Sequence, residues 1–207
     1  TTLKHNPSGH RARKRFGQNF LHDQHIIERI VKAIMPQQNQ VLVEIGPGQG
    51  AITAPLLAAG AKLTAIEIDR DLASMLRTRF ADNSDFTLIE MDVLKFDFST
   101  LTTQQQLLRI LGNLPYNIST PLLFHLLQYQ QLIHDMVFML QLEVVERLAA
   151  TPGSGSYGRL SVMMQYHCKV EQLFKVPPGA FVPQPKIDSA IVRLTPHRPL
   201  PVVANDT

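Results

Sequence analysis

Short apolar runs alternate with segments of helical periodicity along most of the chain. Isoleucine and valine recur between residues 26 and 34 at the spacing of one helical face, with Asp23 placed to cap the helix and Pro36 just beyond its end. Further helices are predicted near residues 53–59, after the capping residue Asp69, from Thr120-Pro121 with proline in the first turn, and through residues 144–148. Apolar runs predict strands over residues 41–45, 62–68, 86–91, 107–111, 136–140, 170–176 and 189–194.

This alternation of strands and helices predicts an α/β fold. The strand runs are apolar at nearly every position, which is typical of strands buried on both faces. We therefore expect a mostly parallel seven-stranded sheet with helices on both faces. The domain is expected to occupy residues 23–195, after an N-terminal arm over residues 1–22 and before a proline-rich linker over residues 196–207.

Basic side chains gather at the N-terminus, although the formal net charge of the 207 residues is only +3. No acidic residue precedes Asp23, whereas five basic residues do: Lys4, Arg11, Arg13, Lys14 and Arg15. Such an arm suits the phosphate backbone of a nucleic acid or an anionic membrane surface, and a solvated terminus without a partner has the same composition. The charge alone therefore leaves these three interpretations open.

Cysteine content and hydropathy narrow the class of protein. Cys168 is the only cysteine, which excludes a disulfide framework and a cysteine-based zinc site and is typical of a reducing compartment. No stretch approaches the roughly 18 apolar residues of a membrane span, and no apolar segment follows the basic N-terminal residues as it would in a signal peptide. We expect a cytoplasmic protein without a membrane association.

A glycine-rich loop follows the first predicted strand. Gly46 and Gly48 stand where the backbone of such folds approaches a ligand, at the carboxyl end of the sheet. Glu67, at the end of the second predicted strand, is placed to accept hydrogen bonds from two ribose hydroxyls. Asp92 follows the third predicted strand, where it is placed either to accept a hydrogen bond from an adenine amino group or to cap a helix. NAD and S-adenosylmethionine both fit this pattern. Asp69 and neighbouring acids are explained by a helix start, so no metal site is predicted.

The segment after the fourth strand, Asn113-Leu114-Pro115-Tyr116, indicates the chemistry. Adenine N6 is a poor nucleophile because its lone pair is delocalised into the ring. The Asn113 carboxamide and the Leu114 carbonyl can each accept one N6 hydrogen and aim that lone pair at a methyl sulfonium. Pro115 stiffens the turn and Tyr116 offers a flat face for stacking. Because an oxidoreductase has no use for this segment, it favours a methyltransferase that uses S-adenosylmethionine.

Two further segments are candidates for the same site. Phe181 stands in a proline-stiffened loop before the last strand, where it is placed to form the other half of a sandwich around an extruded base or to pack into the core. Residues 16–21 lie between the basic arm and the first helix, and their amide side chains are placed to close over the cofactor.

With these motifs taken together, the chain closely resembles the bacterial rRNA adenine dimethyltransferases, and among them the enzymes of the small ribosomal subunit. The resemblance rests on residues 13–21, 43–50, 112–121 and 181–189, which span most of the chain. It implies a Rossmann-like class I methyltransferase fold. It also implies the addition of two methyl groups to each of two adjacent adenines in the 3′-terminal hairpin loop of 16S rRNA, within an immature small subunit.

The resemblance also assigns residues. It implies cofactor contacts at Asn19, Leu21, Gly46, Gly48, Glu67, Asp92 and Asn113. It implies that the target base is presented by Asn113, Leu114, Pro115, Tyr116 and Phe181. The basic arm then becomes an RNA-binding element, with candidate contacts at Arg11, Arg13, Lys14 and Arg15. S-adenosyl-L-methionine is the implied cofactor, without a metal, and the expected state is a monomer.

Two features depart from the family's pattern. The family carries a small helical domain after this core, so we expect RNA affinity and target choice to depend on residues beyond Thr207. Leu142 stands where the family pattern suggests a lysine. The nearest alternatives are the related large-subunit enzymes that methylate 23S rRNA, a binding factor in ribosome assembly or transcription, and a DNA adenine methyltransferase.

Overall fold

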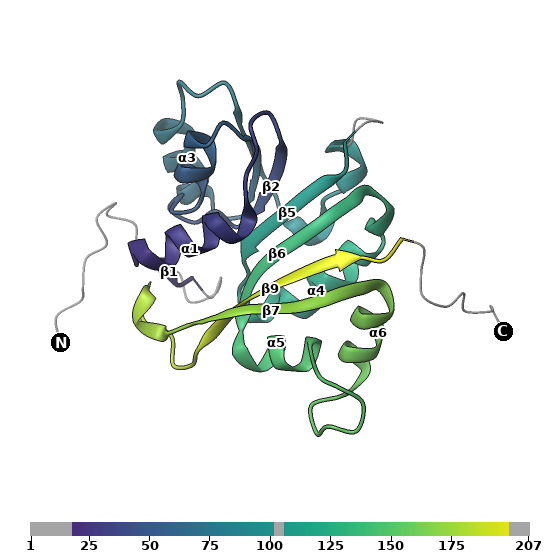
Figure 1. Cartoon of the computed structure of the whole chain (residues 1–207). Helices are drawn as coiled ribbons and strands as arrows, with labels where there is room; N and C mark the ends of the chain where they lie inside the picture. The colour runs from purple at the N-terminus through teal and green to yellow at the C-terminus, as the bar shows by residue number, and fades with distance from the viewer. Residues whose placement is uncertain (1–17, 102–105, 199–207) are drawn as a thin grey trace.

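Seven strands form one sheet in the computed structural model, which describes residues 18–101 and 106–198 (Figure 1). The spatial order is β4-β3-β2-β5-β6-β9-β7. The strands are β2 (Val41–Ile45), β3 (Lys62–Glu67), β4 (Phe86–Glu90), β5 (Leu108–Asn113), β6 (Ile133–Gln141), β7 (Cys168–Val176) and β9 (Ser189–Pro196). All neighbours pair in parallel except β9, which is antiparallel to both β6 and β7. The predicted mostly parallel seven-stranded sheet is confirmed.

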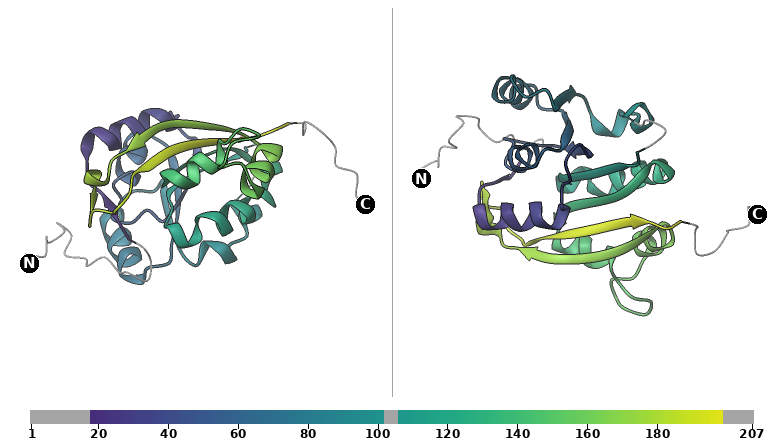
Figure 2. Two further views of the ribbon diagram at one scale, coloured as in Figure 1. Left: turned by 90° about the horizontal axis from the view of Figure 1, so that it is seen from below. Right: turned by 45° about the horizontal axis from the view of Figure 1, so that its top comes forward.

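Helices cover both faces of the sheet, as predicted (Figure 2). One face carries α1 (Gln24–Ile34), α2 (Thr53–Ala58) and α3 (Arg70–Arg79), and the other carries α4 (Tyr116–Leu127), α5 (Leu142–Leu148) and α6 (Arg159–His167). Short 3-10 turns are η2 (Val93–Lys95), η3 (Phe98–Leu101), η4 (Gln130–Leu132) and η5 (Pro178–Ala180). Buried apolar side chains form one cluster between the sheet and α1 and α2, and a second between the sheet and α4, α5 and α6.

The start and end of α1 follow from its sequence. The Asp23 carboxylate accepts a hydrogen bond from the backbone N–H of Ile26 at 3.1 Å, as the N-cap prediction requires. Met35 then ends the helix in the left-handed region, with φ of 52°. The four buried residues Ile26, Ile27, Ile30 and Ile34 form the apolar stripe against the sheet.

The predicted start of the helix near Thr120-Pro121 is wrong. The helix α4 begins four residues earlier at Tyr116, with Pro115 at the N-cap and Pro121 inside the helix. Proline within a helix removes the hydrogen bond to the carbonyl four residues before it, which here belongs to the exposed Asn117. Because that carbonyl is near water, the helix tolerates the proline and can start directly after the Asn113 to Tyr116 turn.

A two-stranded sheet that the sequence did not predict lies beside the main sheet. The strand β1 (Phe20–Leu21) pairs antiparallel with β8 (Phe181–Val182), with Phe20 opposite Val182 and Leu21 opposite Phe181. The backbone N–H of His22 also donates to the Ala180 carbonyl at 2.9 Å. This pairing holds the segment before α1 against the proline-rich loop before β9, although 160 residues separate Leu21 from Phe181.

Candidate active site

A cavity of about 690 Å³ opens at the carboxyl ends of the parallel strands. Sheets of this class bind ligands at that edge. Its lining contains all the candidate cofactor and base residues that the structure describes: Asn19, Leu21, Gly46, Gly48, Glu67, Asp92, Asn113, Leu114, Pro115, Tyr116 and Phe181. The candidate RNA contacts Arg11, Arg13, Lys14 and Arg15 lie outside the described residues. Sequence-distant candidates therefore share one cavity, and their roles stay predictions.

The glycine-rich loop takes a backbone conformation that only glycine adopts readily. Gly46 and Gly48 have φ of +62° and +59°, in the left-handed region. A Cβ atom on Gly48 would lie 3.2 Å from the Phe20 ring, which is too close for ordinary contact. The loop therefore presents bare backbone to the cavity between β2 and α2. This geometry suits a ligand held against the main chain.

Glu67 holds the glycine loop and the start of α3 together. Its side chain is buried, with 5% exposed, and its two carboxylate oxygens accept N–H bonds from Asp69 at 2.9 Å and Gly48 at 3.3 Å. Burial raises the pKa of Glu67 to about 7, and the two N–H donors partly offset that rise. Each oxygen has a second lone pair, so the carboxylate can still accept hydrogen bonds from a vicinal diol in the cavity.

Asp92 lies at the end of the next strand and has a structural contact as well. Its Oδ1 accepts a hydrogen bond from the Leu94 N–H at 3.0 Å and so caps η2, which was the alternative role considered from sequence. Asp69 likewise caps α3, accepting from the N–H groups of Asp71 and Leu72, so its interpretation as a helix start is confirmed. Gln18 donates to the other Asp69 oxygen at 2.8 Å. Among the residues that the structure describes, no three His, Cys, Asp or Glu side chains gather to hold a metal.

Asn113 stands at the last position of β5 with its amide already oriented. The Nδ2 atom donates to the Asn19 carbonyl at 3.2 Å, which leaves the carboxamide oxygen to accept from an amino group. The Leu114 N–H donates to the Met139 carbonyl at 3.1 Å. The Leu114 carbonyl accepts no backbone hydrogen bond within residues 18–101 and 106–198. The Asn113 carboxamide oxygen and the Leu114 carbonyl are thus two available acceptors at the carboxyl end of β5.

The two candidate stacking residues differ in exposure. Tyr116 is 61% exposed at the start of α4, whereas Phe181 is 3% exposed and packs in the same buried cluster as Leu21 and Ala180. Both line the cavity. The sequence therefore identified an aromatic at the opening and one in the inner wall. It did not predict that β1 would cover Phe181.

Glu44 is a further carboxylate in the lining that the sequence analysis did not assign to a role. It is 3% exposed, and the Thr53 hydroxyl donates to its Oε2 at 2.6 Å. Burial raises the pKa of Glu44 to about 7, the Thr53 hydrogen bond lowers it and the nearby Glu67 raises it further. An acidic residue inside the otherwise apolar run of residues 41–45 was the signal that could have identified it.

We expect the Glu44→Gln variant to change how stability depends on pH. Because the pKa of Glu44 is raised in the folded protein, its contribution to stability is complete below its ordinary pKa of 4.5 and is lost as pH rises through about 7. The variant removes this loss. Its free energy of unfolding, measured by urea denaturation, should therefore gain about 2–3 kcal/mol on the parent between pH 4.5 and about pH 8. Parallel pH profiles for the two proteins would contradict the buried carboxyl.

The chemistry of these groups fits an adenosyl cofactor with a methyl group to transfer. The glycine loop offers bare backbone, Glu67 offers acceptors for ribose hydroxyls, and Asp92 and Asn113 offer acceptors at the two neighbouring strand ends. NAD shares the ribose and adenine that these acceptors would bind, so the case for a methyl donor rests on the turn from Asn113 to Tyr116 in the same cavity.

Comparison with protein families gives one match that covers nearly the whole sequence. The model of the family described as "Ribosomal RNA adenine dimethylase" matches residues 9–207. A protein named "Ribosomal RNA small subunit methyltransferase A" from Hahella chejuensis is 60% identical over 204 residues, which is 98% of this chain and 75% of that protein. Its namesake from Pseudomonas putida is 61% identical over 197 residues, covering 95% of this chain and 74% of that one.

Solved structures show the same arrangement of the chain. A dimethyladenosine transferase from Plasmodium falciparum superposes with a TM-score of 0.78 and 32% identity, covering 87% of this chain and 64% of that one. The 23S rRNA methyltransferase ErmE superposes with a TM-score of 0.78 and 28% identity, covering 90% and 73%. These structures have the fold of this chain, and they are named as a dimethyladenosine transferase and an rRNA methyltransferase, the class of enzyme that the cavity residues suggest.

Proposed function

This chain belongs to the ribosomal RNA adenine dimethylase family, and from that premise we propose that it dimethylates N6 of two adjacent adenines in the 3′-terminal hairpin loop of 16S rRNA. It is an rRNA adenine dimethyltransferase. We propose S-adenosylmethionine as the methyl donor and an immature small ribosomal subunit as the substrate. We further propose that the chain acts as a monomer in the cytoplasm.

One observation carries the assignment of the chemistry. The turn from Asn113 to Tyr116 ends β5 inside the same cavity as the glycine loop of Gly46 and the carboxylate of Glu67. The cofactor carries its methyl group on a positive sulfonium, so the group is activated before it reaches the protein. The protein's task is then to hold the adenine amino group in line with it.

The residues around β5 can perform that task. The Asn113 carboxamide oxygen and the Leu114 carbonyl would each accept one N6 hydrogen, which turns the nitrogen lone pair out of conjugation and towards the methyl group. Tyr116, which is largely exposed, would stack on one face of the extruded base. Phe181 in the inner wall would limit the depth to which the base enters.

The choice of the small subunit is supported by the degree of similarity. The relatives named as small-subunit methyltransferases are 60% and 61% identical to this chain, whereas the 23S rRNA methyltransferase is 28% identical. Phosphate contacts from the basic arm, with Arg11, Arg13, Lys14 and Arg15 as candidates, would contribute affinity without sequence preference. No helix in the described parts of the chain has the length and apolarity to cross a membrane.

The test is to incubate small subunits that lack the modification with labelled S-adenosylmethionine and to digest the 16S rRNA for mass spectrometry. Four labelled methyl groups on two adjacent adenines of the 3′-terminal hairpin are expected. Label on 23S rRNA supplied in parallel would favour the large-subunit activity instead. Binding of the subunits without methyl transfer would contradict an enzymatic role.

We expect Glu67→Ala to weaken cofactor binding by about 1–3 kcal/mol, because two ribose hydroxyls would lose their acceptor. Isothermal titration calorimetry with S-adenosylmethionine measures this directly, and the parent protein should give no heat with NAD. Glu90→Ala is the matched control, since Glu90 is the register partner of Glu67 on β4 but forms an exposed ion pair with Arg77. Equal losses in both variants, or tight NAD binding by the parent, would contradict the assignment.

A further inference from the structure

Two polar side chains in the cavity have no role in the mechanism above. Gln141 is the last residue of β6 and Ser189 the first residue of β9, and the two are directly paired in the antiparallel register. Both are partly buried and both line the cavity. Neither side chain makes a hydrogen bond to another residue in the described ranges 18–101 and 106–198.

The strand register places both side chains on the same face of the sheet as Asn113. Asn113 pairs with Met139 on β6, and Met139 pairs with Ile191 on β9. Gln141 lies two residues beyond Met139, and Ser189 lies two residues before Ile191. Because side chains alternate between the faces of a strand, residues at this spacing point to the same side.

These positions lie further towards the opening than Asn113. Gln141 stands one strand over from Asn113 and two residues further along, which corresponds to about 7 Å along the strand direction. The cavity lining also contains apolar side chains, among them Phe181 and Ile187. A few hydrogen-bonding groups among apolar ones are the arrangement by which binding pockets fix the orientation of a flat ligand.

We propose that Gln141, assisted by Ser189, reads the ring edge of the target adenine through a hydrogen bond to one of its ring nitrogens. This inference rests on the proposed function. With both N6 hydrogens accepted by Asn113 and Leu114, the adenine still offers the ring nitrogens N1 and N7 as acceptors beside the amino group. The Gln141 amide NH₂ and the Ser189 hydroxyl are donors that match them.

The experiment uses 16S rRNA whose synthetic 3′ segment carries adenosine, 1-deazaadenosine or 7-deazaadenosine at the target, in reconstituted small subunits. We expect one deaza analogue to lower kcat/KM of the parent about 10- to 100-fold, and Gln141→Leu to lower it by a similar factor on adenosine. Combined, the two changes should cost no more than either alone, because both delete the same hydrogen bond. The analogue that shows this behaviour identifies the ring nitrogen.

Two controls separate this role from others. Gln128→Leu alters an exposed glutamine after α4, outside the cavity lining, and should leave kcat/KM unchanged. The dissociation constant for S-adenosylmethionine should be the same in Gln141→Leu as in the parent. Ser189→Ala supplies a second variant should Gln141→Leu fold poorly, and the parent with the deaza substrates needs no variant at all.

The possible outcomes are distinct. Full sensitivity of Gln141→Leu and Ser189→Ala to both deaza analogues would overturn the inference, as would unchanged turnover of the parent on both analogues. A loss of cofactor affinity equal to the loss of turnover would assign Gln141 to the cofactor and also overturn it. Failure of the parent to methylate the adenosine substrate would instead contradict the proposed function.

Discussion

Replacing Asn113 with alanine is expected to lower the rate of methyl transfer about 10²- to 10³-fold while leaving the protein folded. The carboxamide oxygen is proposed to accept a hydrogen bond that strengthens as the N6 lone pair turns towards the methyl group. Removal of one such preorganised partner typically reduces turnover by this factor. Single-turnover kinetics with enzyme in excess over small subunits measure the methyl-transfer step apart from product release.

The same variant also removes a tether. Because Nδ2 of Asn113 donates to the Asn19 carbonyl, Asn113→Ala should weaken cofactor binding somewhat, and the rate must be measured at saturating cofactor. Asn83→Ala, in the turn before β4, provides the control, because the Asn83 side chain accepts a hydrogen bond from the Asp85 N–H. Wild-type turnover by Asn113→Ala would refute the role of the carboxamide, and a loss fully restored by higher cofactor concentration would restrict that role to binding.

The strands could be predicted because burial on both faces leaves a direct trace in the sequence. The runs at residues 41–45 and 62–68 are mostly apolar, and they form β2 and β3, which both have a neighbouring strand on each side. Candidate site residues such as Glu67, Asp92 and Asn113 were found for the same reason. In a parallel sheet, residues that directly follow apolar runs meet at one edge.

Contacts between distant segments left no such trace. The pairing of Leu21 with Phe181 depends on the register of two short strands, and neither has enough residues for a period to be seen. Packing of Phe181 into the core was one of the two alternatives that its loop suggested, and the structure places it in a buried cluster, but its pairing partner could not be read from that loop. The early start of α4 was missed because a proline was interpreted as a first-turn residue, although Pro115 is placed equally well for a cap.

Leu142 shows how a departure from a family pattern can have a packing explanation. It opens α5, donates its N–H to the Asp188 carbonyl at 3.0 Å, and packs against the buried cluster beneath α4, α5 and α6. The apolar side chain of Leu142 is therefore accommodated by packing against the buried cluster. The sequence alone marked the position as unusual without indicating what the side chain contacts.

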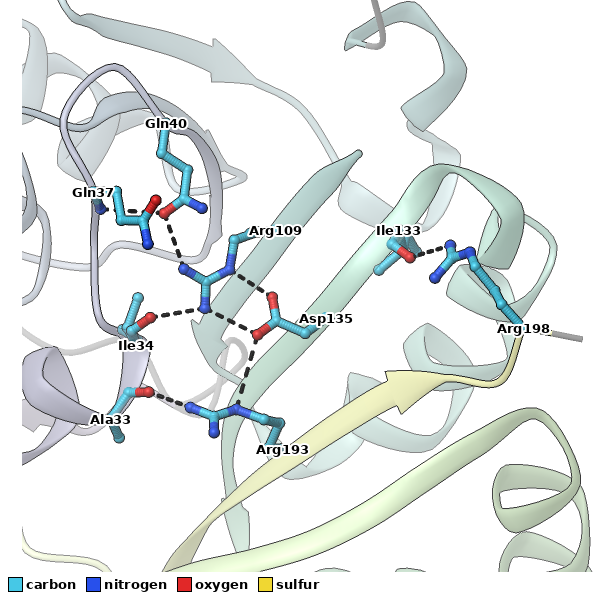
Figure 3. Close-up of polar contacts among 9 residues, drawn as sticks. All are labelled: Ala33, Ile34, Gln37, Gln40, Arg109, Ile133, Asp135, Arg193 and Arg198. Atoms are coloured by element: carbon cyan, nitrogen blue, oxygen red, sulfur yellow. Dashed lines mark hydrogen bonds and ion pairs between the residues drawn. The ribbon is translucent and has the colours of Figure 1, made fainter. Parts of the chain in front are cut away.

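Charged residues inside apolar strands were visible in the sequence, but their partners were not. Arg109 lies in β5 and Asp135 in β6, and both are buried. Figure 3 shows that the Arg109 guanidinium donates to both Asp135 oxygens, at 2.7 and 2.9 Å, and to the Ile34 carbonyl at 2.7 Å. The group lies near the amino-terminal ends of β5 and β6, away from Asn113. It fixes the end of α1 to the sheet.

A second arginine, Arg193, also lies beside the Asp135 carboxylate. Arg193 on β9 lies 3.8 Å from Asp135 and donates to the Ala33 carbonyl, while Arg109 also donates to the Gln40 side chain at 2.9 Å. One carboxylate thus balances two buried or partly buried guanidinium groups from two strands. Since a buried charge without a counterion is costly, the two arginines depend on Asp135 for their burial.

We therefore expect Asp135→Ala to lower the free energy of unfolding by about 3–5 kcal/mol, a large share of the 5–15 kcal/mol typical of a domain. Urea denaturation, with thermal melting as a check, measures the loss. The matched control is Glu143→Ala, which breaks the 2.5 Å ion pair with Arg147 on the exposed side of α5 and should cost at most about 0.5 kcal/mol.

Replacing Arg109 with methionine in the Asp135→Ala background should recover part of the loss, because one uncompensated charge is then removed. Equal costs for Asp135→Ala and Glu143→Ala would show that the buried group contributes no more than a surface pair. A further loss on adding the methionine would show that Arg109 stabilises the fold through Ile34 and Gln40 and not through the carboxylate.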